Sequence, residues 1–143
     1  MRNNNNFLFE TAADLPYAIL KASAAGGDIY FYPTLYQLTL MDGEVERRVD
    51  LGYAGSRILE RLLMSAGELV PREELLRYAW ADRVVSDGSL NQQIYVLRKV
   101  LGDEKKRAII QTLPRRGYML NPRAVFRPAA DEPALAQAPL VPR

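Results

Sequence analysis

The sequence predicts an α+β fold, and three features of the chain support this class. Residues 28–51 contain three short strand-like runs, which is typical of an antiparallel sheet. Residues 54–101 contain segments whose apolar side chains recur at helical spacing. Residues 109–120 contain two more short runs around a turn, which predicts a β-hairpin. The expected order is therefore sheet, helices and hairpin.

The length of 143 residues fits one domain with extensions. The chain has no cysteine and no histidine, which excludes disulfides, the metal sites built from these residues, and catalytic triads that need either one. An enzyme would depend on carboxylates, lysine, serine or tyrosine. The adjacent Glu73 and Glu74 point in different directions on a helix and suit its positive N-terminus. We therefore expect no enzymatic activity, no cofactor and no metal.

Residues 1–27 are expected to form an N-terminal extension that is partly disordered or contains a short helix. The helix would lie within residues 7–24, and Pro16 would interrupt it. No basic start followed by a long apolar core is present, so the segment does not resemble a signal peptide. A break at residues 25–27 precedes the domain, which is expected to span residues 28–121.

Three strands are predicted within the domain, at residues 28–32, 36–41 and 45–51. Asp42 and Gly43 supply a tight turn between the last two strands. Their aromatic residues are interpreted as packing residues of the sheet.

Two helices are predicted next, at residues 54–65 and 71–80. Pro71 is suited to a first helical turn because its missing N–H would be unbonded there. The link between the helices is short, so they are expected to pack against each other.

A third helix is predicted over residues 87–101. Its apolar stripe consists of Leu90, Ile94, Leu97 and Leu101. Ser86 or Asp87 can cap its first turn, and Gly102 ends it. The opposite face carries Gly88, Gln92, Tyr95 and Lys99, flanked by Asn91, Val96 and Arg98. One side therefore belongs to a core, while the other can form hydrogen bonds and carries positive charge.

The hairpin has a basic tip, because Arg115 and Arg116 lie between Pro114 and Gly117 at its turn. Positive charge is concentrated in this half of the chain. Residues 96–123 hold two acidic side chains and eight basic ones, namely Arg98, Lys99, Lys105, Lys106, Arg107, Arg115, Arg116 and Arg123. An amide-rich helix followed by a basic hairpin is a winged-helix arrangement. The helix would enter a DNA major groove, and the wing would reach the backbone or the minor groove.

Four segments carry a resemblance to a known family: LTLMDGEVERRVDL, SRILERLLMSAGELVPREELLRYAW, VVSDGSLNQQIYVLRKVLGD and IIQTLPRRGYML. They occur in order between about Phe31 and Leu120. This run resembles the OmpR/PhoB-type winged-helix DNA-binding domain, and more closely the ToxR-like and CadC-like branch of membrane-anchored transcriptional regulators. The resemblance implies a regulator, expected to be an activator, that binds double-stranded promoter DNA sequence-specifically.

The resemblance also implies the residues that contact DNA. They are Trp80, Ser89, Asn91, Gln92, Tyr95, Val96, Arg98, Lys99, Thr112, Arg115, Arg116 and Tyr118. The amides of Asn91 and Gln92 can pair with adenine, and Arg98 is expected to bind phosphate first. Gln93 lies nearer the buried stripe, so it ranks below them. Trp80, Ser89 and Thr112 match positions that donate to backbone phosphates.

Two departures from the family pattern affect the expected affinity. Gly88 stands where the family often has a phosphate-binding arginine, and Val96 stands where relatives place a base-reading arginine. Both indicate a modest affinity of one protomer, offset by self-association on repeated DNA sites. The resemblance further implies contact with RNA polymerase through the loop 81–87.

Residues 122–143 are rich in proline and alanine and are expected to be a linker. Residues 140–143, LVPR, resemble the remnant of a protease cleavage site, which indicates a shortened chain. The chain has no run of 18 apolar residues, and no receiver domain is expected within it. The expected localisation is cytoplasmic, as the cytoplasmic domain of a single-pass inner-membrane protein whose membrane tether is absent from this chain.

An alternative function remains at this stage. Winged helices also bind proteins, and the basic face would suit an acidic partner. The basic tip formed by Arg115 and Arg116 beside an amide-rich helix face favours DNA.

Overall fold

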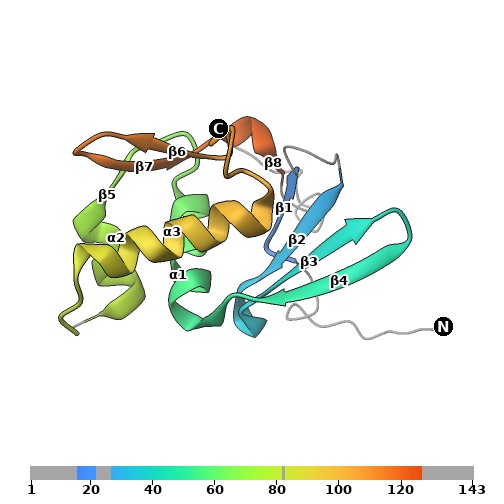
Figure 1. The fold of residues 1–143 in the computed structure, drawn as a ribbon, viewed down its shortest axis with the longest axis horizontal. Helices are drawn as coiled ribbons and strands as arrows, with labels where there is room; N and C mark the ends of the chain where they lie inside the picture. The colour runs from blue at the N-terminus through green and yellow to red at the C-terminus, as the bar shows by residue number, and fades with distance from the viewer. Residues whose placement is uncertain (1–15, 22–26, 82, 127–143) are drawn as a thin grey trace, which may run out of the picture.

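The computed structural model describes residues 16–21, 27–81 and 83–126. An antiparallel sheet lies at one end of this part of the chain, and three helices and a small second sheet lie at the other end (Figure 1). The predicted α+β fold, a winged helix-turn-helix with an N-terminal sheet, is confirmed.

Five strands form the N-terminal sheet of the described region, in the order β4-β3-β2-β1-β8, and all neighbours are antiparallel. Strands β2 (Asp28–Tyr32), β3 (Gln37–Asp42) and β4 (Val45–Asp50) confirm the three predicted strands. A short 3-10 helix, η2 (Pro33–Leu35), connects β2 to β3. The turn between β3 and β4 places Gly43 at a φ of 68°, where glycine is not strained.

Two strands lie outside the predicted domain boundaries of 28 and 121. Strand β1 (Ala18–Lys21) lies where a short helix was expected, and β8 (Val125–Phe126) follows η3 (Pro122–Ala124) in the expected linker. The helix prediction was wrong for β1, because four residues give too few alternations to separate a strand from a helix. Pairing of β1 with both β2 and β8 decides its conformation. The other parts of the predicted extension and linker, including residues 140–143, lie outside the described residues.

The three predicted helices are confirmed as α1 (Gly52–Met64), α2 (Arg72–Trp80) and α3 (Asp87–Leu101). Helix α1 begins two residues earlier than predicted, where the Asp50 carboxylate accepts a hydrogen bond of 2.9 Å from the Gly52 N–H. The α1 and α2 helices pack together as expected, and the Arg61 Nε lies 3.4 Å from a carboxylate oxygen of Glu74.

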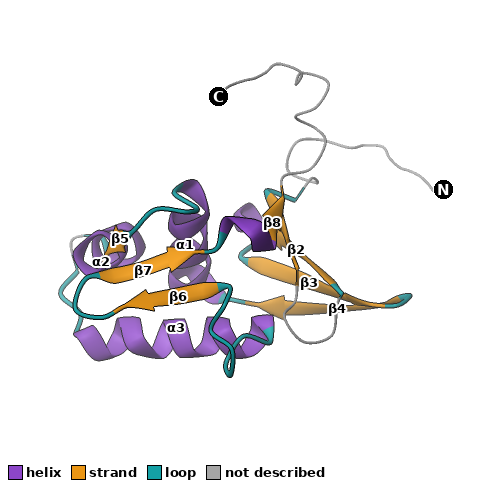
Figure 2. Cartoon of the chain, turned by 90° about the horizontal axis from the view of Figure 1, so that it is seen from above, coloured by secondary structure: helices purple, strands orange, loops and turns teal. Residues whose placement is uncertain are grey.

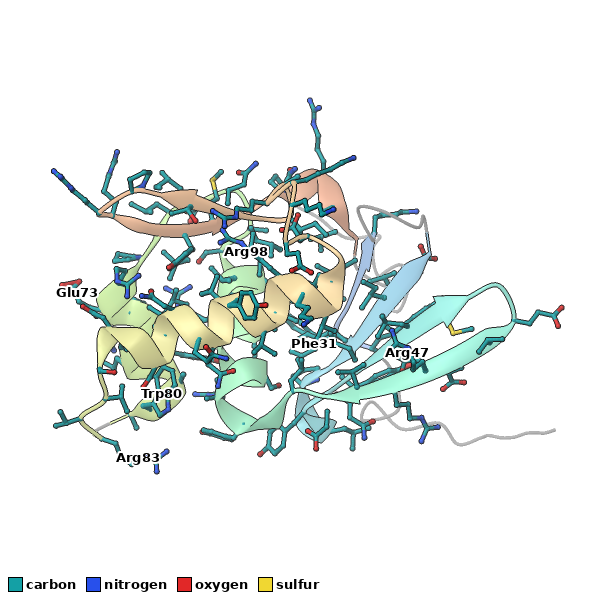
Figure 3. The ribbon with its side chains drawn as sticks, viewed as in Figure 1. Phe31, Arg47, Glu73, Trp80, Arg83 and Arg98 are labelled. Atoms are coloured by element: carbon teal, nitrogen blue, oxygen red, sulfur yellow. The ribbon has the colours of Figure 1, made fainter. Side chains whose placement is uncertain are left out.

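The core lies where the inner face of the N-terminal sheet meets the helices. Figure 3 shows Phe31 at this junction. Fully buried side chains come from the sheet and from α1, α2 and α3, among them Phe31, Leu38, Ile58, Leu62, Leu75, Leu90 and Leu97. Burial of one such leucine contributes about 1.5–3 kcal/mol. Because the predicted apolar stripe of α3 is buried in this core, the opposite face of α3 must point outward.

The second sheet carries the hairpin, with the strand order β5 (Val70–Pro71), β7 (Gly117–Leu120), β6 (Ile110–Leu113). A Cβ atom on Gly117 would lie 2.1 Å from the backbone oxygen of Val70, so only glycine permits β5 and β7 to approach this closely. The hairpin runs along α3, and the two elements lie side by side in both views (Figures 1 and 2).

Candidate nucleic-acid interface

Helix α3 presents a polar face to solvent. The Ser86 side chain caps the helix by accepting a hydrogen bond from the Ser89 N–H, and Gly102 ends it in the left-handed conformation. The predicted face residues Asn91, Gln92, Tyr95, Val96 and Lys99 are all exposed. The structure therefore brings these five predicted residues together on one surface.

Gln93 lies elsewhere, as the helical geometry predicts. It is partly buried, and its side-chain oxygen lies 3.1 Å from the position that a Cβ on Gly55 of α1 would occupy. The Ser89 side chain is also partly buried, and its hydroxyl lies 3.4 Å from that of Ser86.

Trp80 lies at the end of α2, beside the loop that leads to α3 (Figure 3). Its side chain is partly buried and packs against the core. The loop itself is open to solvent: Val84 is 99% exposed, and Arg83 and Ser86 are exposed too. A fully exposed valine in a loop has no packing role in the described structure.

Arg98 differs from its predicted placement. Its side chain is only 8% exposed and lies between α3 and the hairpin (Figure 3). The guanidinium donates to the backbone oxygen of Ile110 from Nε and Nη2, at 3.1 and 2.7 Å, and to the Thr112 hydroxyl at 2.7 Å. Burial, and then the positive charge of Arg107, lower the pKa of Arg98. The expected phosphate contact does not fit this placement, because Arg98 already holds β6 to α3.

Two predicted residues on the hairpin take part in the same attachment. Thr112 is exposed, but its hydroxyl accepts the hydrogen bond from Arg98. Tyr118 is only 7% exposed, and its hydroxyl accepts a hydrogen bond of 3.0 Å from Arg72 of α2. A hydroxyl that accepts one bond still has a proton to donate. Each hydroxyl therefore keeps a proton that it can donate to an external acceptor.

The tip of the hairpin is the exposed basic part of the wing. Arg115 and Arg116 are both exposed, and Arg115 adopts a φ of 68° in the turn. The Arg116 N–H closes the turn by donating to the Leu113 oxygen at 2.9 Å. Neither guanidinium forms an ion pair or a side-chain hydrogen bond within the described residues, so the structure leaves both available for an external anion.

The basic loop between α3 and β6 is organised by one buried carboxylate. Asp103 has no exposed surface, and its two side-chain oxygens accept hydrogen bonds of 2.7–3.0 Å from the N–H groups of Ala108, Ile109 and Ile110. Arg107 adopts a φ of 50° in this loop. From the sequence, Asp103 counts only as a negative charge, because a carboxylate that organises a loop has no recognisable spacing pattern.

A groove of about 340 Å³ lies between α3 and the hairpin. It is lined by Asn91, Ile94, Tyr95, Arg98, Glu104, Arg107 and Tyr118. The groove thus joins the exposed face of α3 to the wing and makes them one continuous surface.

Sequence reasoning missed Arg72, the first residue of α2. Its guanidinium lies within hydrogen-bond distance of Tyr118, Asp87 and Asn91, and therefore connects α2, α3 and β7. These partners lie 15 to 46 residues away in the sequence, so no local pattern could have identified them. Within the described residues, no group of three acidic side chains is placed to hold a metal ion, and no helix is long and apolar enough to cross a membrane.

The fold and this surface define the class: a winged helix-turn-helix domain with a polar, basic helix face beside a basic wing. Comparison with protein families agrees, since residues 46–120 match the family described as "Transcriptional regulatory protein, C terminal". The chain belongs to this family, which consists of regulators and not of enzymes.

Two relatives support the branch that the sequence motifs indicated. The chain is 35% identical over 106 residues to the transcriptional regulator HilA of Salmonella typhimurium, covering 71% of this chain and 19% of HilA. It is 40% identical over 86 residues to the cholera toxin transcriptional activator of Vibrio cholerae, covering 57% of this chain and 29% of that protein. The chain thus spans less than a third of the length of either relative.

Solved structures show the same fold. The DNA-binding domain of E. coli CadC has a TM-score of 0.61 and 25% identity, and the match covers 79% of this chain and 97% of that one. The AdeR DNA-binding domain, solved with an intercistronic region, has a TM-score of 0.53 at 14% identity, with 65% and 93% coverage. The second likeness concerns the fold alone.

Proposed function

We propose that this domain binds double-stranded promoter DNA sequence-specifically and thereby activates transcription. The observation that carries the proposal is the attachment of the wing to α3 through Arg98. This attachment fixes the amide-rich face of α3 and the basic tip relative to each other. Two elements that contact one DNA duplex at two places bind it more tightly when they are already held in one geometry, because less ordering is needed on binding.

The exposed face of α3 is suited to reading bases. An α-helix fits the B-DNA major groove, which is about 12 Å wide, and α3 has 15 residues. Gln92 carries an exposed amide that can pair with adenine, and Tyr95 and Val96 offer apolar contact for a thymine methyl group. Lys99 adds a positive charge one turn further along. Trp80 and Ser89 lie at the phosphate side of this surface in our proposal.

The wing is proposed to bind the DNA backbone or the adjacent minor groove. Arg115 and Arg116 are exposed at the tip, and each would neutralise phosphate charge and release a counterion. Thr112 and Tyr118 would add hydroxyl contacts from the hairpin. Phosphate contacts orient a protein on the duplex without selecting a sequence, so the helix and the wing have separate roles.

RNA polymerase is the proposed protein partner, and the loop 81–87 is the proposed contact. The support is the exposure of Val84 and Arg83 in a loop that lies next to the DNA-reading helix. A valine exposed to this extent is more readily explained by a partner than by the fold.

Self-association on repeated DNA sites is proposed because one protomer offers few base-reading groups.

The relatives that the chain matches are much longer than this domain, and one of them is of the ToxR type. We infer a cytoplasmic domain that a membrane tether outside this chain anchors to the inner membrane.

The test is binding of the domain to a fluorescent DNA fragment from upstream of its own operon, against random DNA of equal length, at two salt concentrations. The upstream fragment is expected to keep its advantage at the higher salt. Replacing Gln92 with alanine should mainly reduce this advantage, by about tenfold for one lost amide pair.

Replacing Arg116 with alanine should weaken binding to both DNAs and reduce the slope of log affinity against log salt by about one. Equal losses on both DNAs for the Gln92 variant would contradict the base-reading role. Absence of DNA binding, with retained binding to an acidic protein partner, would support the interaction-module alternative instead.

A further inference from the structure

One guanidinium group lies where three elements of the interface meet. Arg72 Nη1 donates to the Tyr118 hydroxyl at 3.0 Å, and Nη2 donates to the Asp87 backbone oxygen at 3.3 Å. Nη2 also donates to the Asn91 side-chain oxygen at 3.1 Å and lies 3.5 Å from a carboxylate oxygen of Asp87. The wing, the start of α3 and the start of α2 are thus joined through a single side chain.

This contact determines which way the Asn91 amide points. A guanidinium has only donors, so the atom of Asn91 that faces Arg72 must be the oxygen, because an amide NH₂ group in that place would meet another donor. The NH₂ group of Asn91 consequently points away from Arg72. Asn91 is exposed and lines the groove between α3 and the wing, where DNA would lie in the proposed function.

The fixed amide changes what Asn91 can read. Pairing of an asparagine with adenine needs both amide atoms at the base edge, where the oxygen accepts from N6 and the nitrogen donates to N7. The bond with Arg72, which is assisted by a full positive charge, holds that oxygen toward Arg72 and leaves only one of its two lone pairs for a base. Guanine O6 and N7, thymine O4 and phosphate oxygens need only a donor, whereas adenine offers the acceptor N7 beside an amino group that is itself a donor.

Gln92 offers an internal contrast. It follows Asn91 on the same exposed face, and its side chain makes no hydrogen bond within the described part of the chain. Its amide can therefore rotate to present an oxygen and a nitrogen together. Two neighbouring amides on one helix then have different preferences, although their chemical groups are identical.

We propose that Arg72 is a positioning residue that fixes Asn91 as a hydrogen-bond donor, so that Asn91 favours guanine, thymine or a phosphate over adenine, whose single acceptor N7 lies beside the N6 amino donor. This inference rests on the proposed function. It differs from the expectation that Asn91 and Gln92 both pair with adenine.

The experiment is selection of bound sequences from a randomised DNA library by the wild-type domain and by variants, with thermal unfolding of each variant recorded. Asn91→Ala identifies the base position that Asn91 reads. Asn91→Asp keeps an oxygen for Arg72 and removes both donors, so the preference for guanine or thymine over adenine at that position should fall about tenfold. The ratio between bases is compared because the added negative charge weakens binding to every sequence.

The variants of Arg72 test its positioning role. Arg72→Met releases the amide, and adenine should then become accepted at the position that Asn91 reads, which loss of stability alone would not produce. Arg72→Lys remains a donor and should keep the wild-type preference. Arg77→Met is the matched control, because Arg77 lies on the same helix and pairs with Glu74 of that helix, and not with a residue of α3. It should leave the selected sequence unchanged.

The acceptor that Asn91 contacts on DNA can be a base or a phosphate, and these two cases give different results. If the acceptor is a base, Asn91→Ala changes one position of the selected site. If it is a phosphate, Asn91→Ala weakens binding to all sequences, and a neutral methylphosphonate at one position of the DNA backbone reproduces the loss.

Three results would overturn the inference: an adenine preference of the wild type that Asn91→Ala removes, no effect of Asn91→Ala on binding, or an unchanged base preference in a folded Arg72→Met variant. If Arg72→Met does not fold, Asn91→Asp decides alone, and its failure to change the preference or the affinity overturns the inference too. A wild-type domain that binds no DNA would refute the proposed function itself, which is a separate result.

Discussion

Replacing Arg98 with methionine separates a structural role from a direct contact with DNA. Methionine keeps much of the length and apolar surface of the arginine stem and removes every donor. In the structure this change deletes two bonds to the Ile110 oxygen and one to the Thr112 hydroxyl. A bond from a charged donor contributes about 1.5–3 kcal/mol, and methionine recovers part of the burial. We expect the free energy of unfolding to fall by about 3 kcal/mol.

The assay is thermal and urea-induced unfolding of the variant beside Lys99→Met. A loss of about 3 kcal/mol corresponds to a decrease in Tm of about 10 °C for a domain of this size. Lys99 is the neighbouring residue on α3 and is exposed, so Lys99→Met should change the unfolding free energy by less than about 0.5 kcal/mol. A double-mutant cycle with Thr112→Val should give a coupling of about 1 kcal/mol, because Thr112 is one of the two acceptors.

One result would refute this reasoning about Arg98. If Arg98→Met unfolded like the wild type but bound all DNA sequences more weakly, with a shallower salt dependence, the guanidinium would be a phosphate contact. The resemblance to the family implied that role, whereas the observed burial and bonding of Arg98 argue against it.

Three further changes test how the wing and the core are built. Gly117→Ala should lower the free energy of unfolding in urea by about 3 kcal/mol, because its Cβ would meet the Val70 backbone. The control Gly43→Ala, whose Cβ lies in open space, should lower it by about 1 kcal/mol. Equal losses would contradict the close approach of β5 and β7. Asp103→Ala leaves three buried N–H groups without their carboxylate and should lower the free energy of unfolding by about 3 kcal/mol, with a smaller loss for Asp103→Asn. An unchanged free energy of unfolding for Asp103→Ala would show that water replaces the carboxylate. Burial, and then the charge of Glu60, raise the pKa of Tyr78 above its usual 10.0. The unfolded state therefore loses this proton first, and the free energy of unfolding should fall as pH rises past about 10. Tyr78→Phe should weaken this pH dependence, which unfolding at pH 8 and pH 11 measures.

The elements with strong local signals were predictable from the sequence. Helix α3 has a regular apolar stripe, a serine cap and a glycine end, and all three features occur as expected. The tip of the wing was predictable for the same reason, because a proline, two arginines and a glycine determine a turn locally. The family was recognisable too, since its motifs lie in these locally determined segments, and residues 46–120 match it.

What the sequence by itself determined is which side chains point outward from α3 and how the chain turns at the wing. Periodicity and turn chemistry fix these over a few residues. Only the tertiary structure decided that β1 is a strand, that Arg98 is hydrogen-bonded to the hairpin, and that Arg72 reaches Asn91. The physical reason is the same in each case: strand pairing and buried hydrogen bonds depend on partners far away in the sequence, and only the folded chain brings those partners within bonding distance.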